Sequence, residues 1–258
     1  MMDYLLTENG RTDLEALMKV RSLYAFDFDG TLAKIVRDHH SAQLGRPIRF
    51  WLGELAKRAP TAIISGRSVE DLRSRVGTAV PYLIGNHGSE GPHTAQEVIQ
   101  QVREICHGWL QFINERYHAE LTRCGASVEN KSYSLSLHYR NADRRDEAKT
   151  LIFRILDELS PRPRIVLGKS VVNVMPLGAS HKGEAVLECI RQFNCTAALY
   201  VGDDETDEDV FALGDPRILT VRIGKKNASS ARFFLKRQTE ITEVLRRLVE
   251  VADRSIHT

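Results

Sequence analysis

Short apolar runs alternate with helical patterns at both ends of this chain of 258 residues, and this alternation constrains the fold more than any other feature of the sequence. Several runs are apolar almost throughout, which is typical of strands buried on both faces of a parallel sheet. Strands that alternate with helices predict an α/β fold, with a parallel sheet and helices on both of its faces. We expect strands at 22–28, 61–65, 81–85, 197–201 and 217–223, and helices at 49–59, 182–193 and 240–252.

The middle of the chain follows a different pattern, which predicts a small α+β insertion. Apolar residues recur at helical spacing over 98–112, whereas residues 132–139 alternate between bulky apolar and polar side chains. Such alternation is typical of a half-exposed strand. The insertion is predicted to be built helix–strand–strand–helix–strand–strand. Its later elements are expected as a helix at 144–159 and a hairpin at 163–176 turning at Gly168-Lys169, and the predicted domains are a core of 1–91 and 178–258 and an insertion of 92–177.

The overall composition gives no electrostatic reason to expect nucleic acid or an anionic membrane as the main partner. The chain has 36 basic and 34 acidic residues, a net charge of +2. No apolar stretch approaches the length of a transmembrane helix, and the first twenty residues lack the basic flank and apolar core of a secretory signal. Four cysteines without a CxxC pair predict reduced thiols and a cytoplasmic protein.

The sequence GDDETDED at 202–209 places six carboxylates within seven residues, directly after the apolar run AALYV. Two carboxylates 4 Å apart repel by about 4 kcal/mol near a protein surface, so the cluster needs a physical reason. Helix-start chemistry supplies part of it, because Thr206 and Asp209 fit a capping box and acidic residues suit a first helical turn. Asp203 and Asp204 end a buried strand instead, at the sheet edge where ligands bind. An adjacent acid pair there favours a hard cation such as Mg²⁺.

A second acid pair ends the first predicted strand, in FDFDGTL. Asp27 and Asp29 precede Gly30, which permits a tight turn, and Thr31, which offers a hydroxyl and a backbone N–H. If the chain bends between the two carboxylates, one can face a metal and attack an electrophile while the other carries a proton. Taken alone, the motif is explained equally well by an Asx turn at a strand end.

A serine and a lysine strengthen the chemical interpretation. Ser65 ends another predicted strand, and Gly66 lets its backbone approach a ligand closely. Lys182 stands at a helix start, where a cation is unfavourable by about 0.3–1 kcal/mol, and a phosphate bound at that helix end would reverse the sign. Taken singly, these are a turn residue and a surface lysine. With the two acid pairs they form a specific combination in a fixed order.

In this order the motifs resemble those of the haloacid dehalogenase-like phosphotransferases, whose core is a Rossmann-like α/β domain. DFDGT resembles the first motif, Ser65 the second, Lys182 the third and GDDETD the fourth. The resemblance implies that Asp27 is a nucleophile forming an aspartyl-phosphate and that Asp29 protonates the leaving oxygen and then activates water. It also implies phosphate binding by Thr31, Ser65, Gly66 and Lys182, and a Mg²⁺ site at Asp27, the backbone carbonyl of Asp29, Asp203 and Asp204, with Asp207 in the outer shell.

A closer resemblance, to the trehalose-6-phosphate phosphatases, runs through almost the whole chain. It is carried by DFDGTLAKI, SGR, IGNHGSE, ENKSYSLSLHYR, HKGEAV and GDDETDEDVF, in that order. The resemblance implies that the insertion is a cap closing over the active site and reading the sugar. Glu129, Lys131 and Arg140 would contact the sugar, and His87 is either a ligand contact or a turn residue.

The chain departs from that family at one position. Five residues after the glycine of GKSVVN the family usually has a sugar-binding Glu, and here Asn173 stands there. An amide can donate and accept hydrogen bonds but carries no charge, so the sugar could be read differently.

Alternative functions share the same motifs. One is the same phosphatase chemistry on another phosphosugar, such as a sucrose or glucosylglycerol phosphate. A non-catalytic phosphosugar sensor would not need both Asp27 and Asp29, and a phosphoacceptor signalling domain would not need the insertion. The resemblance links the chain to an upstream trehalose-6-phosphate synthase without implying contact, and the sequence does not predict the oligomeric state.

Overall fold

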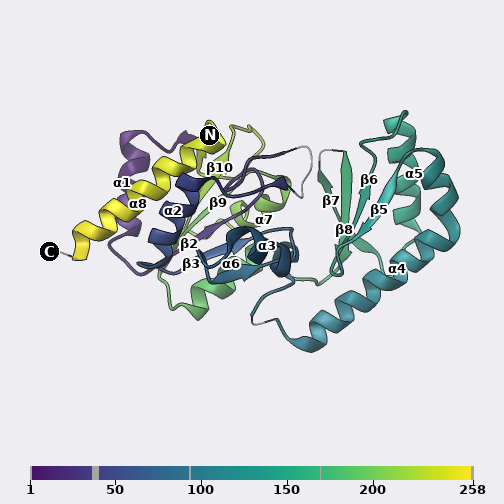
Figure 1. The fold of residues 1–258 in the computed structure, drawn as a ribbon, viewed down its shortest axis with the longest axis horizontal. Coiled ribbons are helices and arrows are strands. Elements are labelled where there is room, and N and C mark those ends of the chain that lie inside the picture. Colours follow the sequence, from purple (N-terminus) through teal and green to yellow (C-terminus); the bar gives the residue numbers. More distant parts are fainter. Residues whose placement is uncertain (1, 37–40, 93, 169, 257–258) are drawn as a thin grey trace. The chain divides into compact units, whose positions relative to one another are not determined.

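The computed structural model describes residues 2–36, 41–92, 94–168 and 170–256 (Figure 1). The chain divides into two compact units, Met1–Pro92 with His181–Thr258 and, between them in sequence, His93–Ser180. We call the first the core unit and the second the inserted unit, and each is described by itself.

The core unit contains a seven-stranded sheet in the order β1-β11-β10-β9-β2-β3-β4, and every neighbouring pair is parallel. The five strands predicted from the sequence are confirmed to within two residues at either end. The two further strands, of two and three residues, were not predicted. The strands are β1 (Asp3–Tyr4), β2 (Ser22–Phe26), β3 (Thr61–Ile64), β4 (Tyr82–Ile84), β9 (Ala197–Gly202), β10 (Ile218–Ile223) and β11 (Phe233–Leu235).

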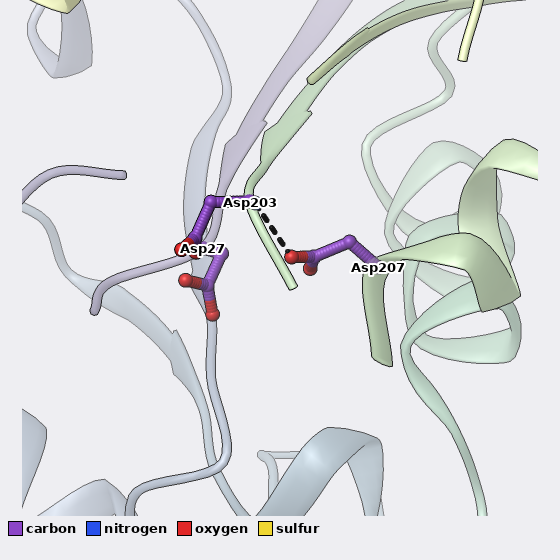
Figure 2. Close-up of side chains that lie close together, drawn as sticks. All are labelled: Asp27, Asp203 and Asp207. Atoms are coloured by element: carbon purple, nitrogen blue, oxygen red, sulfur yellow. Dashed lines mark hydrogen bonds between the residues drawn. The ribbon is translucent and has the colours of Figure 1, made fainter. Parts of the chain in front are cut away.

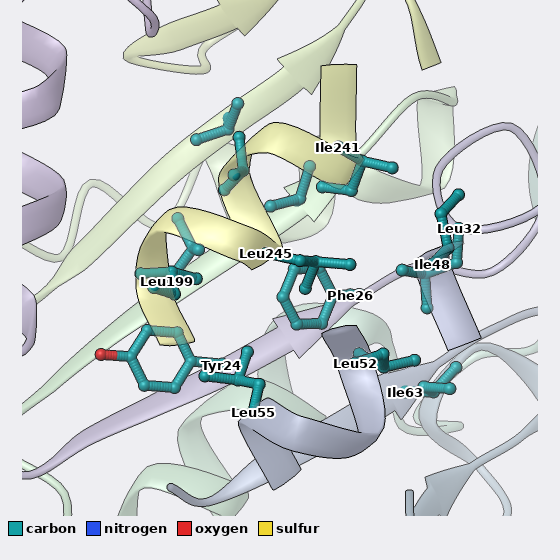
Figure 3. Packing of buried hydrophobic residues seen from close by; sticks show 14 of the residues in the cluster. Tyr24, Phe26, Leu32, Ile48, Leu52, Leu55, Ile63, Leu199, Ile241 and Leu245 are labelled. Atoms are coloured by element: carbon teal, nitrogen blue, oxygen red, sulfur yellow. The ribbon is translucent and has the colours of Figure 1, made fainter. Parts of the chain in front are cut away.

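Helices pack on both faces of this sheet, as the alternating pattern predicts. Successive residues of a strand point to opposite faces, so Tyr24 and Phe26 of β2 pack into one apolar layer and Leu23 and Ala25 into the other. Figure 3 shows the first layer around Tyr24 and Phe26. The helices of the first layer are α1 (Glu8–Leu17), α2 (Arg46–Ala56), α3 (Val69–Val76) and α8 (Ile241–Ile256), and those of the second are α6 (Lys182–Gln192) and α7 (Glu208–Phe211).

The inserted unit follows the predicted order of helix, two strands, helix and two strands. Its four strands form an antiparallel sheet in the order β5-β6-β8-β7, with two helices packed against one face. The predicted hairpin joins β7 and β8; Gly168 ends β7, and Lys169 lies outside the described residues. The elements are α4 (Gln96–Arg123), β5 (Ser127–Asn130), β6 (Leu135–His138), α5 (Arg145–Asp157), β7 (Pro163–Gly168) and β8 (Val171–Pro176).

The expectation of a half-exposed strand at 132–139 is wrong for its centre. Leu135 and Leu137 face the apolar core, but Ser134 and Ser136 on the alternate positions are buried as well. For Ser136 the reason is its position between Glu129 of β5 and Asn173 of β8, whose side chains are larger.

Long helices raise the question of a membrane span. None of the described helices is both long enough and apolar enough to cross a bilayer.

Candidate active site

One residue of each predicted acid pair, Asp27 and Asp203, lies at the carboxyl edge of the core sheet (Figure 2). β2 and β9 are neighbours, so Asp27 follows one strand and Asp203 follows the other at the same edge. From β2 the chain continues to β3 on one side, whereas β9 lies on the other side. Such a reversal of strand order opens a crevice, and ligands of α/β sheets bind there. Ser65 directly follows β3 at the same edge and is buried.

A buried lysine crosses this edge. Lys182, the first residue of α6, is 1% exposed, and its Nζ donates hydrogen bonds to Oδ1 of Asp27 at 2.8 Å and to Oδ1 of Asp207 at 2.7 Å. Burial alone would lower the pKa of Lys182, but the carboxylates of Asp207 and Asp27 outweigh burial and raise that pKa. The site therefore holds a permanent cation beside Asp27.

Asp207 is fully occupied by hydrogen bonds. Its side chain is 0% exposed, and Oδ1 accepts from Lys182 and from the hydroxyl of Tyr200 at 2.7 Å. Its Oδ2 accepts from the backbone N–H groups of Asp203 at 2.8 Å and Asp204 at 2.9 Å. All four usual acceptor positions of the carboxylate are thus taken, and Asp207 fixes the loop that carries Asp203 rather than offering a free oxygen.

This contact also corrects the predicted capping box. The box was expected at Thr206 and Asp209, but Asp207 is the residue whose side chain binds the backbone N–H of Asp204, so the motif begins two residues earlier. The reason is that Asp207 accepts hydrogen bonds from the backbone N–H of Asp203, just after β9, and from the buried Lys182. These contacts keep its side chain inside the protein.

The donor set fits a divalent cation with oxygen ligands. One carboxylate oxygen from each of Asp27, Asp203 and Asp207 lies within 4.8 Å of the other two. Oδ1 of Asp203 is buried and has no hydrogen-bond partner among the described residues. Burial, and then the charges of Asp207 and Asp204, raise the pKa of Asp203 to about 7. Burial also raises the pKa of Asp27, against the attraction of Lys182. Such a crowded acid group is stabilised by a hard cation, and Asp27 and Asp203 are the carboxylates with room for it.

Gly30 and Thr31, in the turn after β2, lie beside the clustered carboxylates. Gly30 has a φ of +81°, and a Cβ there would lie 2.0 Å from Oδ2 of Asp203, so a side chain at this position would displace the carboxylate. Thr31 is buried, and its Oγ1 has no hydrogen-bond partner among the described residues. Nε2 of Gln238 donates to the carbonyls of Thr31 and Leu32 at 3.1 Å each, which holds the turn in place.

The remaining predicted catalytic and metal residues are placed differently. The carboxylate of Asp29 accepts two hydrogen bonds from the guanidinium of Arg67, at 2.5 and 2.7 Å. Its side chain therefore points to Arg67, which leaves the backbone carbonyl of Asp29 for the predicted cation contact. Asp204 is exposed and lies outside the group of three clustered carboxylates.

The loop after β4 lies against the loop after β3. The backbone N–H of His87 donates to the carbonyl of Ser65 at 2.9 Å, and His87 has a φ of 58°. A Cβ on Gly66 would lie 2.5 Å from the His87 ring. Gly66 is thus required by the packing of His87, which brings this predicted sugar contact beside the predicted phosphate loop.

The predicted sugar-binding residues lie in the inserted unit. Glu129, Ser136 and Asn173 are cross-strand neighbours in one row of the sheet, and Oγ of Ser136 donates to Oδ1 of Asn173 at 2.7 Å. Oε2 of Glu129 lies 2.8 Å from Nε2 of His138 and 3.9 Å from Nζ of Lys131. We call Glu129, Lys131, Ser136, His138 and Asn173 the polar row. Arg140 follows β6 and is exposed.

Several supporting residues were missed in the sequence. Tyr200 was considered only as part of an apolar strand and Arg67 only as part of the SGR motif. Gln238 comes from a segment more than two hundred positions from Thr31. Arg222 of β10 is buried and donates to the carbonyls of Asp203 at 2.6 Å and Asp204 at 3.1 Å. A charged residue in an otherwise apolar strand was the available signal for Arg222.

Comparison with known proteins agrees with this arrangement. Residues 25–239 match the family model described as Trehalose-phosphatase. The chain is 34% identical over 249 residues to "Probable trehalose-phosphate phosphatase H" of Arabidopsis thaliana, covering 87% of this chain and 70% of that protein. It is 32% identical over 282 residues to "Probable trehalose-phosphate phosphatase G" of the same plant, covering 97% and 74%.

The fold is shared with solved structures. The C-terminal domain of trehalose-6-phosphate phosphatase from C. albicans superimposes with a TM-score of 0.73 at 22% identity, covering 97% of this chain and 98% of that chain. At that identity the likeness concerns the fold. Because the family model spans most of the chain and the relatives match it over nearly its full length, the protein belongs to the trehalose-phosphatase family.

Proposed function

We propose that the protein hydrolyses trehalose 6-phosphate to trehalose and phosphate, a step of trehalose biosynthesis, through an aspartyl-phosphate on Asp27. The observation that carries the proposal is the contact of Lys182 with Asp27 at 2.8 Å, with Asp203 at the same buried edge. A carboxylate nucleophile and a phosphate monoester are both anions, and they meet only where fixed positive charge offsets their repulsion. Membership of the trehalose-phosphatase family supports this reaction and its substrate.

In the first step, an oxygen of Asp27 forms a bond to phosphorus while the bond from phosphorus to the sugar oxygen breaks. Asp29 gives its proton to the departing oxygen, and trehalose leaves as an alcohol. In the second step, water attacks phosphorus and passes a proton to Asp29, the bond between phosphorus and Asp27 breaks, and phosphate is released. Lys182, Ser65, Thr31 and the backbone N–H of Gly66 are proposed to hold the phosphoryl oxygens.

We propose Mg²⁺ as the cofactor, held by Asp27, Asp203 and the backbone carbonyl of Asp29, with Asp204 as a further contact and Asp207 behind them. When bound, Mg²⁺ would neutralise charge on the nucleophile and the phosphoryl group. The unpartnered oxygen of Asp203 and its raised pKa support this assignment.

We propose that the inserted unit is the substrate-specificity cap and that its polar row, with Arg140 and with His87 of the core unit, contacts the sugar. The hydrogen bond of Ser136 to Oδ1 of Asn173 turns the amide NH₂ away from that contact, so Asn173 would act as a donor to a sugar hydroxyl. A carboxylate at this position could only accept. This difference supports a second candidate, the same chemistry on another phosphosugar.

We further propose a cytoplasmic protein whose substrate is made by a trehalose-6-phosphate synthase, a pathway link that does not imply contact. All four cysteines are free thiols, which supports a reducing compartment.

The test is phosphate release in the presence of Mg²⁺ from trehalose 6-phosphate, sucrose 6-phosphate, glucose 6-phosphate and a glucosylglycerol phosphate. Asp27→Asn removes the nucleophile, and Asp13→Asn, which alters an aspartate paired with Arg232 on the surface, is the matched control. We expect preference for trehalose 6-phosphate, lost in Asp27→Asn and with EDTA. Preference for another phosphosugar would show that trehalose 6-phosphate is not the substrate. Binding of a phosphosugar without release of phosphate would indicate a sensor.

A further inference from the structure

Arg67 forms a bidentate ion pair with the carboxylate of Asp29. Its Nε lies 2.5 Å from Oδ2 and its second terminal nitrogen 2.7 Å from Oδ1 of Asp29. Planar guanidinium groups match carboxylates in this bidentate geometry, which fixes orientation as well as distance. The Arg67 side chain is only 8% exposed, whereas that of Asp29 is 41% exposed. The buried Arg67 thus fixes the position of the more exposed Asp29 side chain.

Arg67 is itself held from three other sides. Its guanidinium lies over the ring of Phe28 at 5.4 Å, and its remaining terminal nitrogen donates to Oδ2 of Asp71 at 2.7 Å. Its backbone N–H donates to Oγ of Ser65 at 3.3 Å, which ties it to the predicted phosphate loop. An arginine with so many contacts has little freedom to reorient.

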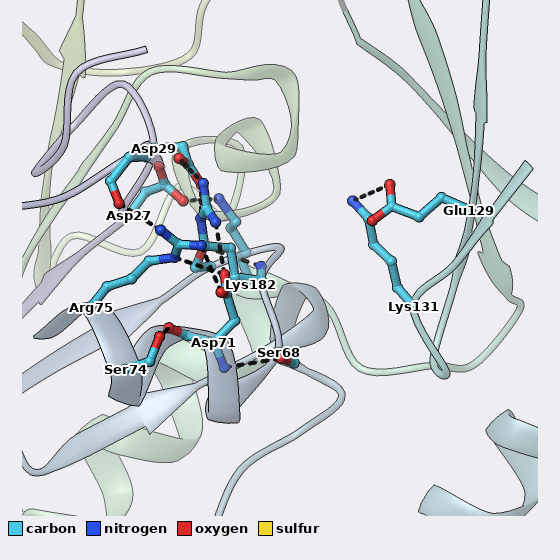
Figure 4. A network of polar contacts seen from close by, with 12 residues as sticks. Asp27, Asp29, Ser68, Asp71, Ser74, Arg75, Glu129, Lys131 and Lys182 are labelled. Carbon is cyan, nitrogen blue, oxygen red and sulfur yellow. Dashed lines mark hydrogen bonds and ion pairs between the residues drawn. The ribbon is translucent and has the colours of Figure 1, made fainter. Parts of the chain in front are cut away.

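Asp71 is in turn anchored in α3, as Figure 4 shows. It accepts two hydrogen bonds from Arg75, at 2.7 and 2.9 Å, and its backbone N–H donates to Oγ of Ser68. Burial would raise the pKa of Asp71, but Arg75 and Arg67 outweigh it and hold that pKa at about 2. Asp29, Arg67, Asp71 and Arg75 form a row of alternating charge that runs from the sheet edge into α3.

We propose that Arg67 is a positioning residue that holds the Asp29 carboxylate in the orientation needed for both proton transfers. The inference rests on the proposed function, because it takes Asp29 as the proton carrier. Each oxygen of Asp29 keeps a second lone pair while it accepts a hydrogen bond from Arg67. The carboxylate can therefore exchange a proton while the bidentate contact with Arg67 stays in place. Misplacing a catalytic group by about 1 Å can reduce rate about a hundredfold, so a fixed orientation has a measurable consequence.

The test uses a leaving group that needs no proton. p-Nitrophenyl phosphate transfers its phosphoryl group to Asp27 as the bond from phosphorus to the aryl oxygen breaks, and nitrophenolate departs as a stable anion. Hydrolysis of the aspartyl-phosphate still requires water to give a proton to Asp29. Loss of Asp29 function therefore slows only the second step with the aryl substrate but both steps with the sugar phosphate.

We would compare Arg67→Lys, which keeps the charge but loses the fork, with Asp29→Asn and with Arg73→Lys, an exposed arginine of α3, as control. The expected result for Arg67→Lys is a burst of nitrophenolate followed by a steady-state rate reduced at least about tenfold. With trehalose 6-phosphate, the first step, measured as the initial release of trehalose, should also slow at least about tenfold. Asp29→Asn should behave alike with larger effects, and Arg73→Lys should match the wild type.

A purely structural role would lower the burst amplitude and the rates on both substrates by one common factor, and this result would overturn the inference. If Asp29→Asn gives the burst and Arg67→Lys does not, only the role of Arg67 is wrong. If Asp29→Asn also lacks it, the assignment of Asp29 in the proposed function is wrong, and the inference with it. Should Arg67→Lys fail to fold, Asp71→Asn removes the rear anchor instead and is expected to give the same burst with a smaller reduction.

Discussion

The core unit and the inserted unit use charge in opposite ways. In the core, Lys182 and Asp207 are buried, and every acceptor position of Asp207 is filled. In the inserted unit, the side chains of Glu129 and Lys131 are 37% and 30% exposed, and their charged atoms lie 3.9 Å apart. Breaking a buried pair costs about 3–5 kcal/mol, whereas an exposed pair contributes about 0–1 kcal/mol. The reacting groups are thus fixed by folding, while the proposed sugar contacts can change with little effect on stability.

The strongest way to break this comparison is Lys182→Met. We expect the free energy of unfolding to fall by about 3–5 kcal/mol, because Asp27 and Asp207 remain buried without their cation, and phosphatase activity to disappear. Urea denaturation measures the first effect. Lys19→Met, at an exposed lysine, is the control. A loss below about 1 kcal/mol would show that the core charges are no more fixed than those of the inserted unit.

The next effect concerns Mg²⁺ and pH. The pKa of Asp203 is raised from 3.8 to about 7, so its protonated form is favoured in the metal-free protein. The stability that this group contributes without metal is present at low pH and is lost as the pH rises through about 7. Since a cation competes with that proton, the apparent affinity for Mg²⁺ should rise about tenfold from pH 6 to pH 8.

Thermal unfolding during Mg²⁺ titration at both pH values measures this difference. Asp203→Asn is expected to remove most of the pH dependence. Equal affinity at the two values in the wild type would contradict the assignment of Asp203.

A smaller pH effect comes from the partly exposed Asp71. Its pKa is lowered to about 2, so its ion pairs stabilise the fold above pH 4 and are lost as the pH falls through about 2. After allowance for solvent screening, we expect Asp71→Asn to lower the free energy of unfolding by about 1 kcal/mol at pH 7 and by less at pH 3. Urea denaturation at the two pH values measures this loss in free energy of unfolding, with Asp13→Asn as the control. An equal loss at pH 3 and pH 7 would contradict the lowered pKa of Asp71.

The smallest expected change in stability sharpens the comparison from the other side. Glu129→Gln should alter the free energy of unfolding by less than about 0.5 kcal/mol, since its ion pair is partly exposed. Activity should nevertheless fall through a higher KM for trehalose 6-phosphate, because the amide is a poorer acceptor for sugar hydroxyls. If stability falls and KM stays constant, the polar row is structural rather than a sugar contact.

The main strands of the core sheet and its acidic edge could be predicted because they depend on local patterns. Buried parallel strands are apolar almost throughout, and the residue after such a strand must lie at the carboxyl edge. Asp27 and Asp203 could therefore be brought together from the sequence alone. The same argument does not reach β1 or β11, which are strands only because of their neighbours.

The supporting contacts could not be predicted, because each depends on residues distant in the sequence. Arg67 lies 38 positions from Asp29, and Lys182 lies 155 positions from Asp27. The buried Ser136 of β6 shows the same limit, since a side chain of that size is covered or exposed according to the strands beside it.

The most direct test of the account is to find the phosphoryl group on Asp27. The Asp29→Asn variant, mixed with p-nitrophenyl phosphate and Mg²⁺ and quenched rapidly in acid, should accumulate the intermediate, because nitrophenolate leaves without a proton while hydrolysis still needs Asp29. Peptide mass spectrometry then maps the phosphoryl group. The account predicts phosphate on the peptide containing Asp27, absent when Asp27 is also changed to Asn. Phosphate release by the wild type with no phosphorylated peptide in the variant, or with the phosphoryl group on another residue, would contradict it.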